Sequence, residues 1–419
     1  MRIDILAFGS LGDVQPYVAL GLGLQKAGHR VRVVTLGGFE AFVYNRGLDH
    51  LSILGTREEI DCTAGARDMV AYRHTDTGFF RGLVNLFNSV IEAGIASYWR
   101  ACQDVEALIV SPYGSIGGGF DIAEALRVPL MRAEPYPFAR PDWEARGNLA
   151  AAVRGKLSDG FWAAFRLVVW GKLRRTTNAA RQNVLALPPL PLLREPFGAM
   201  DRARVPLLAA YSSAVVPRPP HWGDWIHVTG YWFLDTPPEW LPPSTLLDFL
   251  RSGPPPVFVG FGSLPFPNPE ATTTLVIRAL ARAGRRGVLV AGGSKIPNGR
   301  LSDDILSVDY VPHSWLFPQV YAAVHHGGAG VTGAALRAGL PSVVVPVFAD
   351  QPFWAQRVFQ LGAGPPPIPP KRLTEDALTD AIRATASKEM RRRAAAIGAQ
   401  IGQEDGVGRA VEAFVGVAY

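Results

Sequence analysis

The chain has 419 residues, of which 48% are hydrophobic and 19% charged, and its net charge is +6. This length exceeds one ordinary core and this composition excludes a disordered chain, so we expect two globular domains. The only cysteines, Cys62 and Cys102, exclude a disulfide scaffold. The sequence shows neither a signal-peptide pattern nor 18 uninterrupted apolar residues, so we expect a cytoplasmic protein without a membrane span.

In the first third of the chain, apolar runs alternate with helical patterns. A strand is predicted at residues 2–8, and a helix at 14–27 ends at Gly28. Further strands are predicted at 29–36, 104–111 and 128–134, and a helix near 118–126. Apolar strands alternating with helices indicate a parallel, doubly wound α/β sheet.

A basic segment follows. Between residues 140 and 181 there are nine Arg and Lys against three Asp and Glu, a difference equal to the whole net charge. Residues 150–187 have a helical pattern with mixed aromatic and basic side chains. Three interpretations stay open: a lid over a lipophilic substrate, peripheral attachment to an anionic membrane, or a packed helix with a solvated basic face. No recognition motif accompanies the charge, so we expect no nucleic-acid partner.

After a proline-rich stretch at 188–256, the alternation restarts. Strands are predicted near 256–264, 286–293, 306–311, 321–328 and 341–351, and helices at 270–284, 331–339 and 352–362. These patterns predict an N-terminal domain at 1–230, a linker at 231–254, a second domain at 255–395 and a helical tail at 396–419.

Three loops of the second domain contain residues that are suited to bind a ligand. In HHGGAGVT, residues 325–332, glycines follow a strand and open a helix, so backbone N–H groups and the helix dipole favour an anion such as a diphosphate. In PVFADQPFW, residues 346–354, Asp350 and Gln351 can bind several hydroxyls of one sugar, or Asp350 can merely cap a helix. In GFGSL, residues 260–264, Ser263 can donate to a phosphate oxygen.

The order of these loops resembles the nucleotide-sugar-dependent glycosyltransferases of the GT-B fold. The resemblance is carried by GFGS at 260–263, VPHSWLFPQV at 311–320, HHGGAG at 325–330, the run at 336–358, and GSLGDVQPYVAL at the N-terminus. Within the UDP-glycosyltransferase superfamily it is greatest to the branch of sterol 3-beta-glucosyltransferases and bacterial natural-product glycosyltransferases. It implies two Rossmann-like domains facing a central cleft, with the acceptor bound by the N-terminal domain, the donor by the C-terminal domain, and the last helix returning to the first.

The resemblance also implies a donor site, which we expect to bind UDP-glucose, with dTDP-sugars as the alternative. Tyr310 matches an aromatic that stacks on the base, and His325 matches the phosphate-binding histidine, although His326 beside it can exchange roles with it. Thr332 can replace a hydroxyl that is missing at Val331. The complete implied donor set is Ser10, Gly12, Gly262, Ser263, Tyr310, Val311, His325, His326, Gly327, Gly328, Ala329, Gly330, Thr332, Asp350 and Gln351.

The first loop of the chain, GSLGDVQP at 9–16, contains an acid where a phosphate loop would not have one. Relatives of the antibiotic type carry Asp at this position, so Asp13 is the candidate general base that removes the proton of an acceptor hydroxyl. A structural alternative is that Asp13 only caps a helix starting at Val14. No DxD triplet or His/Cys metal pattern occurs, so we expect transfer without metal or cofactor. A single displacement by the acceptor implies inversion at the anomeric carbon.

Two other functions are compatible with the fold. A nucleotide-sugar 2-epimerase would need further acids and a histidine in the cleft, and GSLGD together with FADQ argues against it. A noncatalytic nucleotide-sugar-binding protein is the second alternative, although Asp13, Asp350 and Gln351 are all present. Neither the acceptor nor the oligomeric state can be read from these residues.

Overall fold

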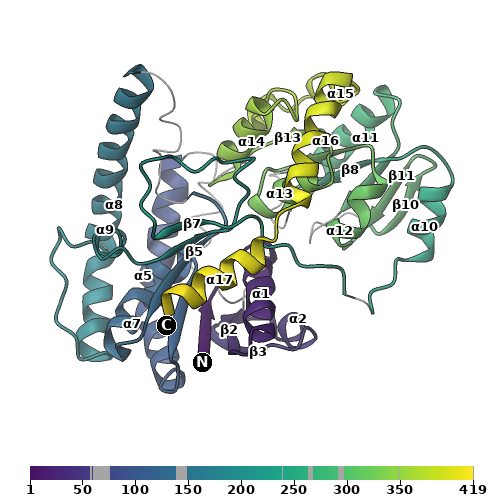
Figure 1. The fold of residues 1–419 in the computed structure, drawn as a ribbon. Helices are drawn as coiled ribbons and strands as arrows, with labels where there is room; N and C mark the ends of the chain where they lie inside the picture. The colour runs from purple at the N-terminus through teal and green to yellow at the C-terminus, as the bar shows by residue number, and fades with distance from the viewer. Residues whose placement is uncertain are drawn as a thin grey trace. The chain divides into compact units, whose positions relative to one another are not determined.

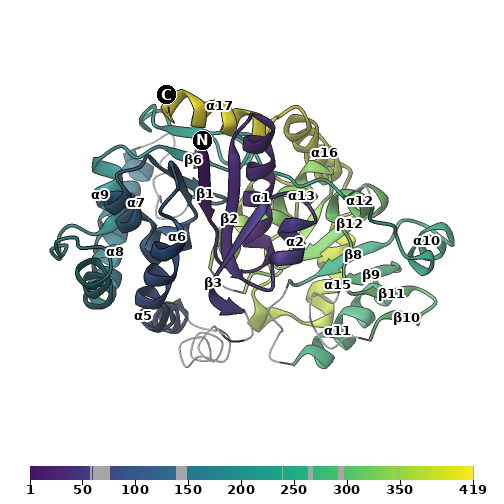
Figure 2. The same cartoon turned by 90° about the horizontal axis from the view of Figure 1, so that it is seen from below.

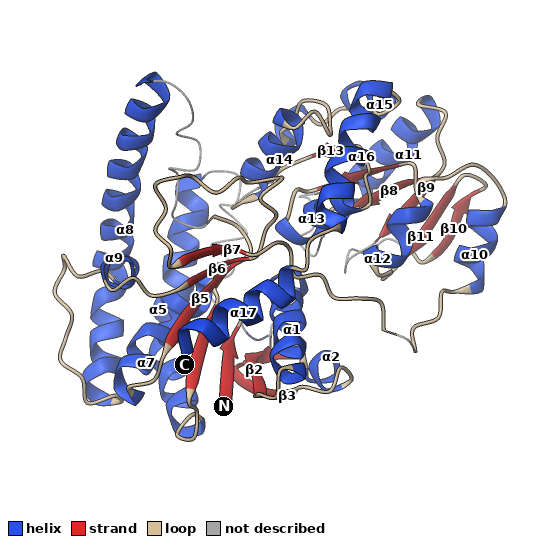
Figure 3. Ribbon diagram, viewed as in Figure 1, coloured by secondary structure: helices blue, strands red, loops and turns tan. Residues whose placement is uncertain are grey.

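The computed structural model describes residues 1–56, 59, 76–137, 149–237, 239–262, 268–290, 297–347 and 349–418. The chain divides into two compact units, each with its own sheet (Figures 1 and 3). Unit 1 comprises Met1–Leu234 and Asp405–Tyr419, and unit 2 comprises Asp235–Glu404. Two α/β units agree with the predicted fold class.

The described part of unit 1 contains a seven-stranded parallel sheet in the order β3-β2-β1-β4-β5-β6-β7. Its strands are β1 (Arg2–Leu6), β2 (Arg30–Gly37), β3 (Asp49–Thr56), β4 (Ala107–Val110), β5 (Leu130–Glu134), β6 (Leu207–Ala209) and β7 (Ile226–Val228). The first three strands lie side by side with α1 (Leu11–Lys26) against them in Figure 2. Burial on both faces explains why the central strands are apolar throughout.

Side-chain alternation along β1 supplies two cores. Ile3, Ile5 and Ala7 join the core that contains α1 and α17 (Gly406–Ala418), whereas Leu6 faces the core beneath α5 and α8. The helices of unit 1 also include α2 (Glu40–Tyr44), α5 (Asp76–Ala101), α6 (Pro112–Gly114), the π-helix η1 (Ser115–Gly119), α7 (Phe120–Leu126), α8 (Leu149–Asn183) and α9 (Pro196–Arg202).

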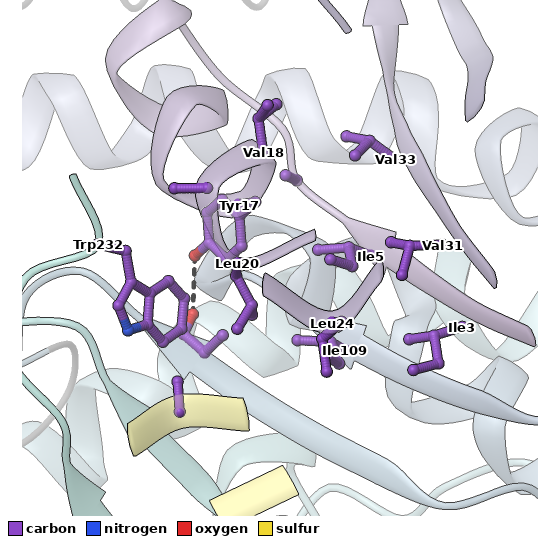
Figure 4. Close-up of a cluster of buried hydrophobic side chains, with 14 of the residues drawn as sticks. Ile3, Ile5, Tyr17, Val18, Leu20, Leu24, Val31, Val33, Ile109 and Trp232 are labelled. Carbon is purple, nitrogen blue, oxygen red and sulfur yellow. Dashed lines mark hydrogen bonds between the residues drawn. The ribbon is translucent and has the colours of Figure 1, made fainter. Parts of the chain in front are cut away.

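Tyr17 of α1 contacts both the sheet and Trp232 in the first core, as Figure 4 shows. Its hydroxyl donates to the Ala133 carbonyl over 2.7 Å, and its ring meets the Trp232 indole edge-on with centroids 6.1 Å apart. Ala410 and Phe414 of α17 are buried in the same core. The last helix therefore packs on α1, as the sequence predicted for the returning tail.

Unit 2 has a six-stranded sheet in its described part, in the order β10-β11-β9-β8-β12-β13. Its strands are β8 (Val257–Gly260), β9 (Gly287–Val290), β10 (Gly299–Ser302), β11 (Ile305–Val308), β12 (Ala322–His325) and β13 (Ser342–Val344). Only β10 runs antiparallel among them. Its helices are α10 (Ser244–Arg251), α11 (Pro269–Arg282), α12 (His313–Leu316), α13 (Ala329–Arg337), α14 (Gln351–Gln360), α15 (Glu375–Ala384) and α16 (Lys388–Gly402), with short 3₁₀ turns at Phe317–Gln319 and Pro370–Arg372.

Several boundaries differ from the prediction. The first helix begins at Leu11 rather than Val14, and the chain passes between units at 234/235, inside the expected linker 231–254. Residues 239–254 already belong to unit 2, because Leu246 and Phe249 of α10 fill its core. The C-terminal segment that belongs to unit 1 begins at Asp405 rather than at 396, because α16 packs on α13 within unit 2.

Strands β3, β6, β7 and β10 were not predicted. Strands β6 and β7 have three residues each and lie in the stretch that prolines marked as connecting chain. Such short strands carry almost no periodicity, so their pairing with β5 and with each other decides their conformation.

Close packing of α16 on α13 yields a stability test. A Cβ at Gly398 would lie 2.8 Å from both the Gly339 nitrogen and the Leu336 carbonyl oxygen, and these backbone atoms cannot move aside cheaply. We expect Gly398→Ala to destabilise unit 2 by about 1–3 kcal/mol, as overpacking does. Urea unfolding measures this loss.

Gly402 is the matched control, because it lies in the same helix and a Cβ there would meet nothing within 4 Å. We expect Gly402→Ala to be neutral or slightly stabilising. Equal stability of the two variants would contradict the packing argument.

Candidate functional site

Three loops of unit 2 start at one edge of its sheet. In the parallel register, His325 at the end of β12 pairs with Gly260 at the end of β8 and with Val344 at the end of β13. The carboxyl ends of parallel strands are where open α/β sheets bind ligands. The register therefore brings together the three loops that the sequence marked separately.

The loop after β12 is folded tightly. His325 is fully buried, and its Nδ1 accepts a hydrogen bond from the Gly327 N–H over 3.1 Å. Gly327 has φ +89°, and a Cβ there would lie 3.0 Å from the Gln351 carbonyl oxygen. Glycine is required at this position, because both the left-handed backbone and the close approach exclude a side chain. Gly327 thus joins the loop after β12 to the start of α14.

His326 lies against the loop after β8. A Cβ at Gly262 would lie 2.9 Å from the His326 Cε1, and the imidazole forms a hydrogen bond with the Gly260 backbone. His326 keeps intermediate exposure, whereas His325 has none. The resemblance matched His325 to the phosphate-binding histidine and left an exchange of roles with His326 open; burial favours His326 as the one that a ligand can reach.

Both imidazoles are neutral at physiological pH. Burial lowers the pKa of His325 to about 3, with smaller contributions from His326 and His313, and burial lowers the pKa of His326 to about 4. His313 has its pKa lowered to about 4 by burial, and its ring stacks on Phe317 with centroids 4.6 Å apart. An anion bound here would meet neutral hydrogen-bond donors rather than imidazolium charge.

Helix α13 opens directly from this loop. Gly328 is its N-cap residue and has no side chain with which to cap the helix, and Gly330 is exposed with open space where a Cβ would be. Backbone N–H groups of a helix's first turn lack intrahelical partners and attract anions. Ala329 is half-buried at this turn. Thr332 is 1% exposed with a buried hydroxyl, so the structure gives no support to the expected phosphate contact from Thr332.

The Asp350–Gln351 pair is held by its surroundings. Asp350 occupies the N-cap position of α14 but makes no capping hydrogen bond; its Oδ2 instead accepts from the Trp354 indole Nε1 over 2.8 Å. Gln351 is buried, and its Oε1 accepts from the Val347 N–H over 2.8 Å. The alternative that Asp350 merely caps the helix therefore fails. Sequence reasoning missed Trp354 as its partner, although a spacing of four residues on a helix was the available signal.

The other expected donor residues have different outcomes. Tyr310 is 48% exposed, so its ring can be reached by a planar ligand, whereas Val311 is 3% exposed. Ser263 lies outside the described residues. The structure therefore brings the starts of the three loops to one edge of the sheet and leaves the Tyr310 ring exposed.

In unit 1, Asp13 is the third residue of α1 and belongs to a capping box. Its Oδ2 accepts from the Ser10 N–H over 2.7 Å and from the Ser10 hydroxyl over 2.8 Å. Gly9 has φ +135°, and a Cβ there would lie 2.6 Å from the Asp13 Cγ. Asp13 and Ser10 are half-buried and Gly12 is exposed, so the loop stays open to ligands. Sequence reasoning missed that Gly9 is what lets the carboxylate approach.

The basic segment is partly ordinary packing. Trp170 and Leu173 are buried, and Arg181 is fully buried in an ion pair with Asp121 at 2.5 Å. Residues 140–148 lie outside the described part. Among the described helices none is long and apolar enough to cross a membrane, and the described His, Cys, Asp and Glu form no group suited to a metal ion.

Two family models match the chain. Residues 3–141 match the glycosyltransferase family 28 N-terminal domain, and residues 288–404 match the C-terminal domain of erythromycin biosynthesis protein CIII-like proteins. The second match contains the loops after β12 and β13, and the first contains Asp13.

Among curated proteins, the chain is similar to sterol 3-beta-glucosyltransferases of Cryptococcus neoformans and Aspergillus fumigatus. Each is 37% identical over 99% of this chain, which covers 27% and 30% of those two proteins. The chain thus spans less than a third of the relatives it matches. Among solved structures, the calicheamicin glycosyltransferase CalG4 has a TM-score of 0.65 at 20% identity, covering 100% of this chain and 99% of that chain. Glycosyltransferase VinC in complex with dTDP has 0.65 at 19%, with the same coverage.

The buried imidazoles make the stability of unit 2 depend on pH. Because the native pKa of His325 is about 3, below the ordinary value of 6.5, the unfolded state binds its proton first as pH falls. Stability is therefore complete above pH 6.5 and is lost progressively below it, by about 2 kcal/mol for His325 between pH 7 and pH 5. Denaturant unfolding at the two pH values measures the loss.

His325→Asn is the informative variant, because asparagine keeps an acceptor for the Gly327 N–H but does not titrate. We expect a smaller loss between pH 7 and pH 5 in this variant than in the wild type. The same slope in both proteins would show that His325 is not the responsible group.

Proposed function

This chain belongs to the GT-B glycosyltransferases of the UDP-glycosyltransferase superfamily, in the branch of sterol 3-beta-glucosyltransferases and natural-product glycosyltransferases, and we propose that it transfers glucose from UDP-glucose to a hydroxyl of a lipophilic small molecule, with inversion. The name of the curated relatives specifies glucose and a sterol. Because the chain spans only part of those proteins, donor, acceptor and stereochemistry are proposals for this chain.

The main support for the proposal is that a candidate anion site lies next to a pair of residues suited to bind sugar hydroxyls. Gly327 lies against the Gln351 backbone, so the first turn of α13 and the Asp350–Gln351 pair adjoin. A nucleoside diphosphate at the helix start would direct its sugar toward a carboxylate and an amide. We assign phosphate binding to His326 and the backbone N–H groups of residues 328–330, whereas the Gly327 N–H is bonded to His325, which supports the loop.

Asp13 is proposed as the general base. Ser10 holds Oδ2 by two hydrogen bonds, which fix the orientation of the carboxylate. Removal of the acceptor proton makes its oxygen nucleophilic as the bond from the anomeric carbon to the diphosphate breaks. The proton goes to Asp13, the sugar to the acceptor oxygen, and the nucleoside diphosphate leaves. A single displacement inverts the anomeric carbon.

A lipophilic acceptor fits the apolar side chains beside Asp13. Phe8 immediately precedes this loop, and a Cβ at Gly117 would lie 3.8 Å from its ring, so the end of β1 adjoins the π-helix η1 that follows β4. Phe87 and Tyr113 are in ring contact with centroids 6.3 Å apart. Phe8, Phe87 and Tyr113 are all half-buried, which leaves apolar surface for a ligand.

Membrane contact through residues 140–181 stays a proposal alongside the lid and packing interpretations. Val168, Lys172 and Arg175 lie on one face of α8 and are exposed. An apolar side chain flanked by cations suits the interface of an anionic bilayer.

A nucleotide screen tests the assignment of unit 2. We expect UDP to raise the melting temperature of the chain, UDP-glucose to raise it at least as much, and GDP to have little effect, because a ligand that binds the folded state adds stability that grows with the logarithm of its concentration over Kd. A larger shift with dTDP-sugars would transfer the proposal to a deoxysugar donor. Nucleotide binding without hydrolysis or transfer to any sterol or polyketide tested would favour the noncatalytic alternative.

Asp13→Asn tests the base. Asparagine keeps an oxygen that accepts from Ser10 but cannot take a proton, so we expect UDP affinity within a few-fold and glucosyl transfer reduced about 100-fold or more. Initial rates with saturating donor measure this effect, and an unchanged melting temperature serves as the folding control. Near-normal transfer would reduce Asp13 to a capping residue.

A further inference from the structure

Trp354 has an unusual position for an indole. It lies one turn into α14, its side chain is 0% exposed, and its ring packs edge-on against Phe353 with centroids 4.8 Å apart. The Nε1 donates to the Asp350 Oδ2 over 2.8 Å. An enclosed ring has one orientation, so this hydrogen bond holds the carboxylate in one orientation as well.

The backbone on the other side of Asp350 is also constrained. Ala349 has φ +54°, a left-handed backbone conformation that residues other than glycine rarely adopt. The Gln351 side chain is bound to the Val347 N–H, and Pro352 restricts the first turn of α14. Strained backbone of this kind clusters at ligand-binding sites. Asp350 is thus held from both sides at a helix start that its carboxylate does not cap.

We propose that Trp354 is a positioning residue, whose indole N–H orients the Asp350 carboxylate toward the hydroxyls of the donor sugar and so determines which hexose the site accepts. The inference rests on the proposed function and adds to it a determinant of sugar specificity. A carboxylate held in one plane accepts hydrogen bonds only from hydroxyls in matching directions. A sugar with one hydroxyl inverted then leaves a polar group unpaired, which is how hydrogen-bonding sites reject close analogues.

The test is Trp354→Phe, which keeps an aromatic ring in the enclosed site and removes the N–H. We expect UDP to bind within about twofold of the wild-type affinity, because UDP lacks the hexose that the Asp350 carboxylate would contact. The KM for UDP-glucose should rise about tenfold, the usual loss for one hydrogen bond to a charged group. The preference for UDP-glucose over its C4 epimer, UDP-galactose, should fall by about the same factor in kcat/KM.

Trp240→Phe is the matched control. It removes the same indole N–H in unit 2, but Trp240 packs against Trp315 and not against Asp350. We expect this variant to retain both the KM for UDP-glucose and the preference between the two sugars. A similar loss in both variants would attribute the effect to general destabilisation and overturn the inference.

A double-mutant cycle with Asp350→Ala separates positioning from packing. If Trp354 acts through the carboxylate, Trp354→Phe has no further effect on sugar preference once Asp350 is alanine. Additive effects would overturn the inference, as would equal losses of affinity for UDP and UDP-glucose. Wild-type protein that binds no nucleotide would instead refute the proposed function itself, whereas retained UDP binding with unchanged sugar preference refutes this inference alone.

Discussion

The parallel register of β8, β12 and β13 is the constraint on which the candidate donor site depends. Gly260, His325 and Val344 are paired neighbours, and each is the last residue of its strand. Loops that are far apart in sequence therefore leave the sheet at one edge. A slip of one residue in β12 would exchange the buried His325 with His326 and separate Gly327 from Gln351.

Local hydrogen bonds then orient the carboxylates at these helix starts. Two acids, Asp13 in unit 1 and Asp350 in unit 2, lie at helix starts, and in both a hydrogen-bond donor at a spacing of three or four residues holds the carboxylate. The donors differ: Ser10 belongs to a capping box, whereas Trp354 contributes a buried indole. Such support converts a common helix-start residue into one with a defined direction.

Much of the fold and of the site could be predicted from the sequence. The alternation of apolar runs and helices predicted two α/β units, and the order of HHGGAG and FADQ predicted the family to which the comparisons assign the chain. The strands at 207–209 and 226–228 escaped prediction because three residues have no usable period and prolines surround them. The point at which the chain re-enters unit 1, Asp405, was not predicted, because the sequence pattern of α16 does not show which unit this helix packs on.

By itself the sequence determined which residue types occur at the ends of strands, since glycine-rich turns and helix-start acids are local signals. Only the tertiary structure decided what those residues do. It buried His325 and Thr332, kept His326 partly exposed, and turned Asp350 from a cap into a partner of Trp354. The reason is physical: burial and hydrogen-bond partnership depend on neighbours brought together by packing, and a linear pattern does not record them.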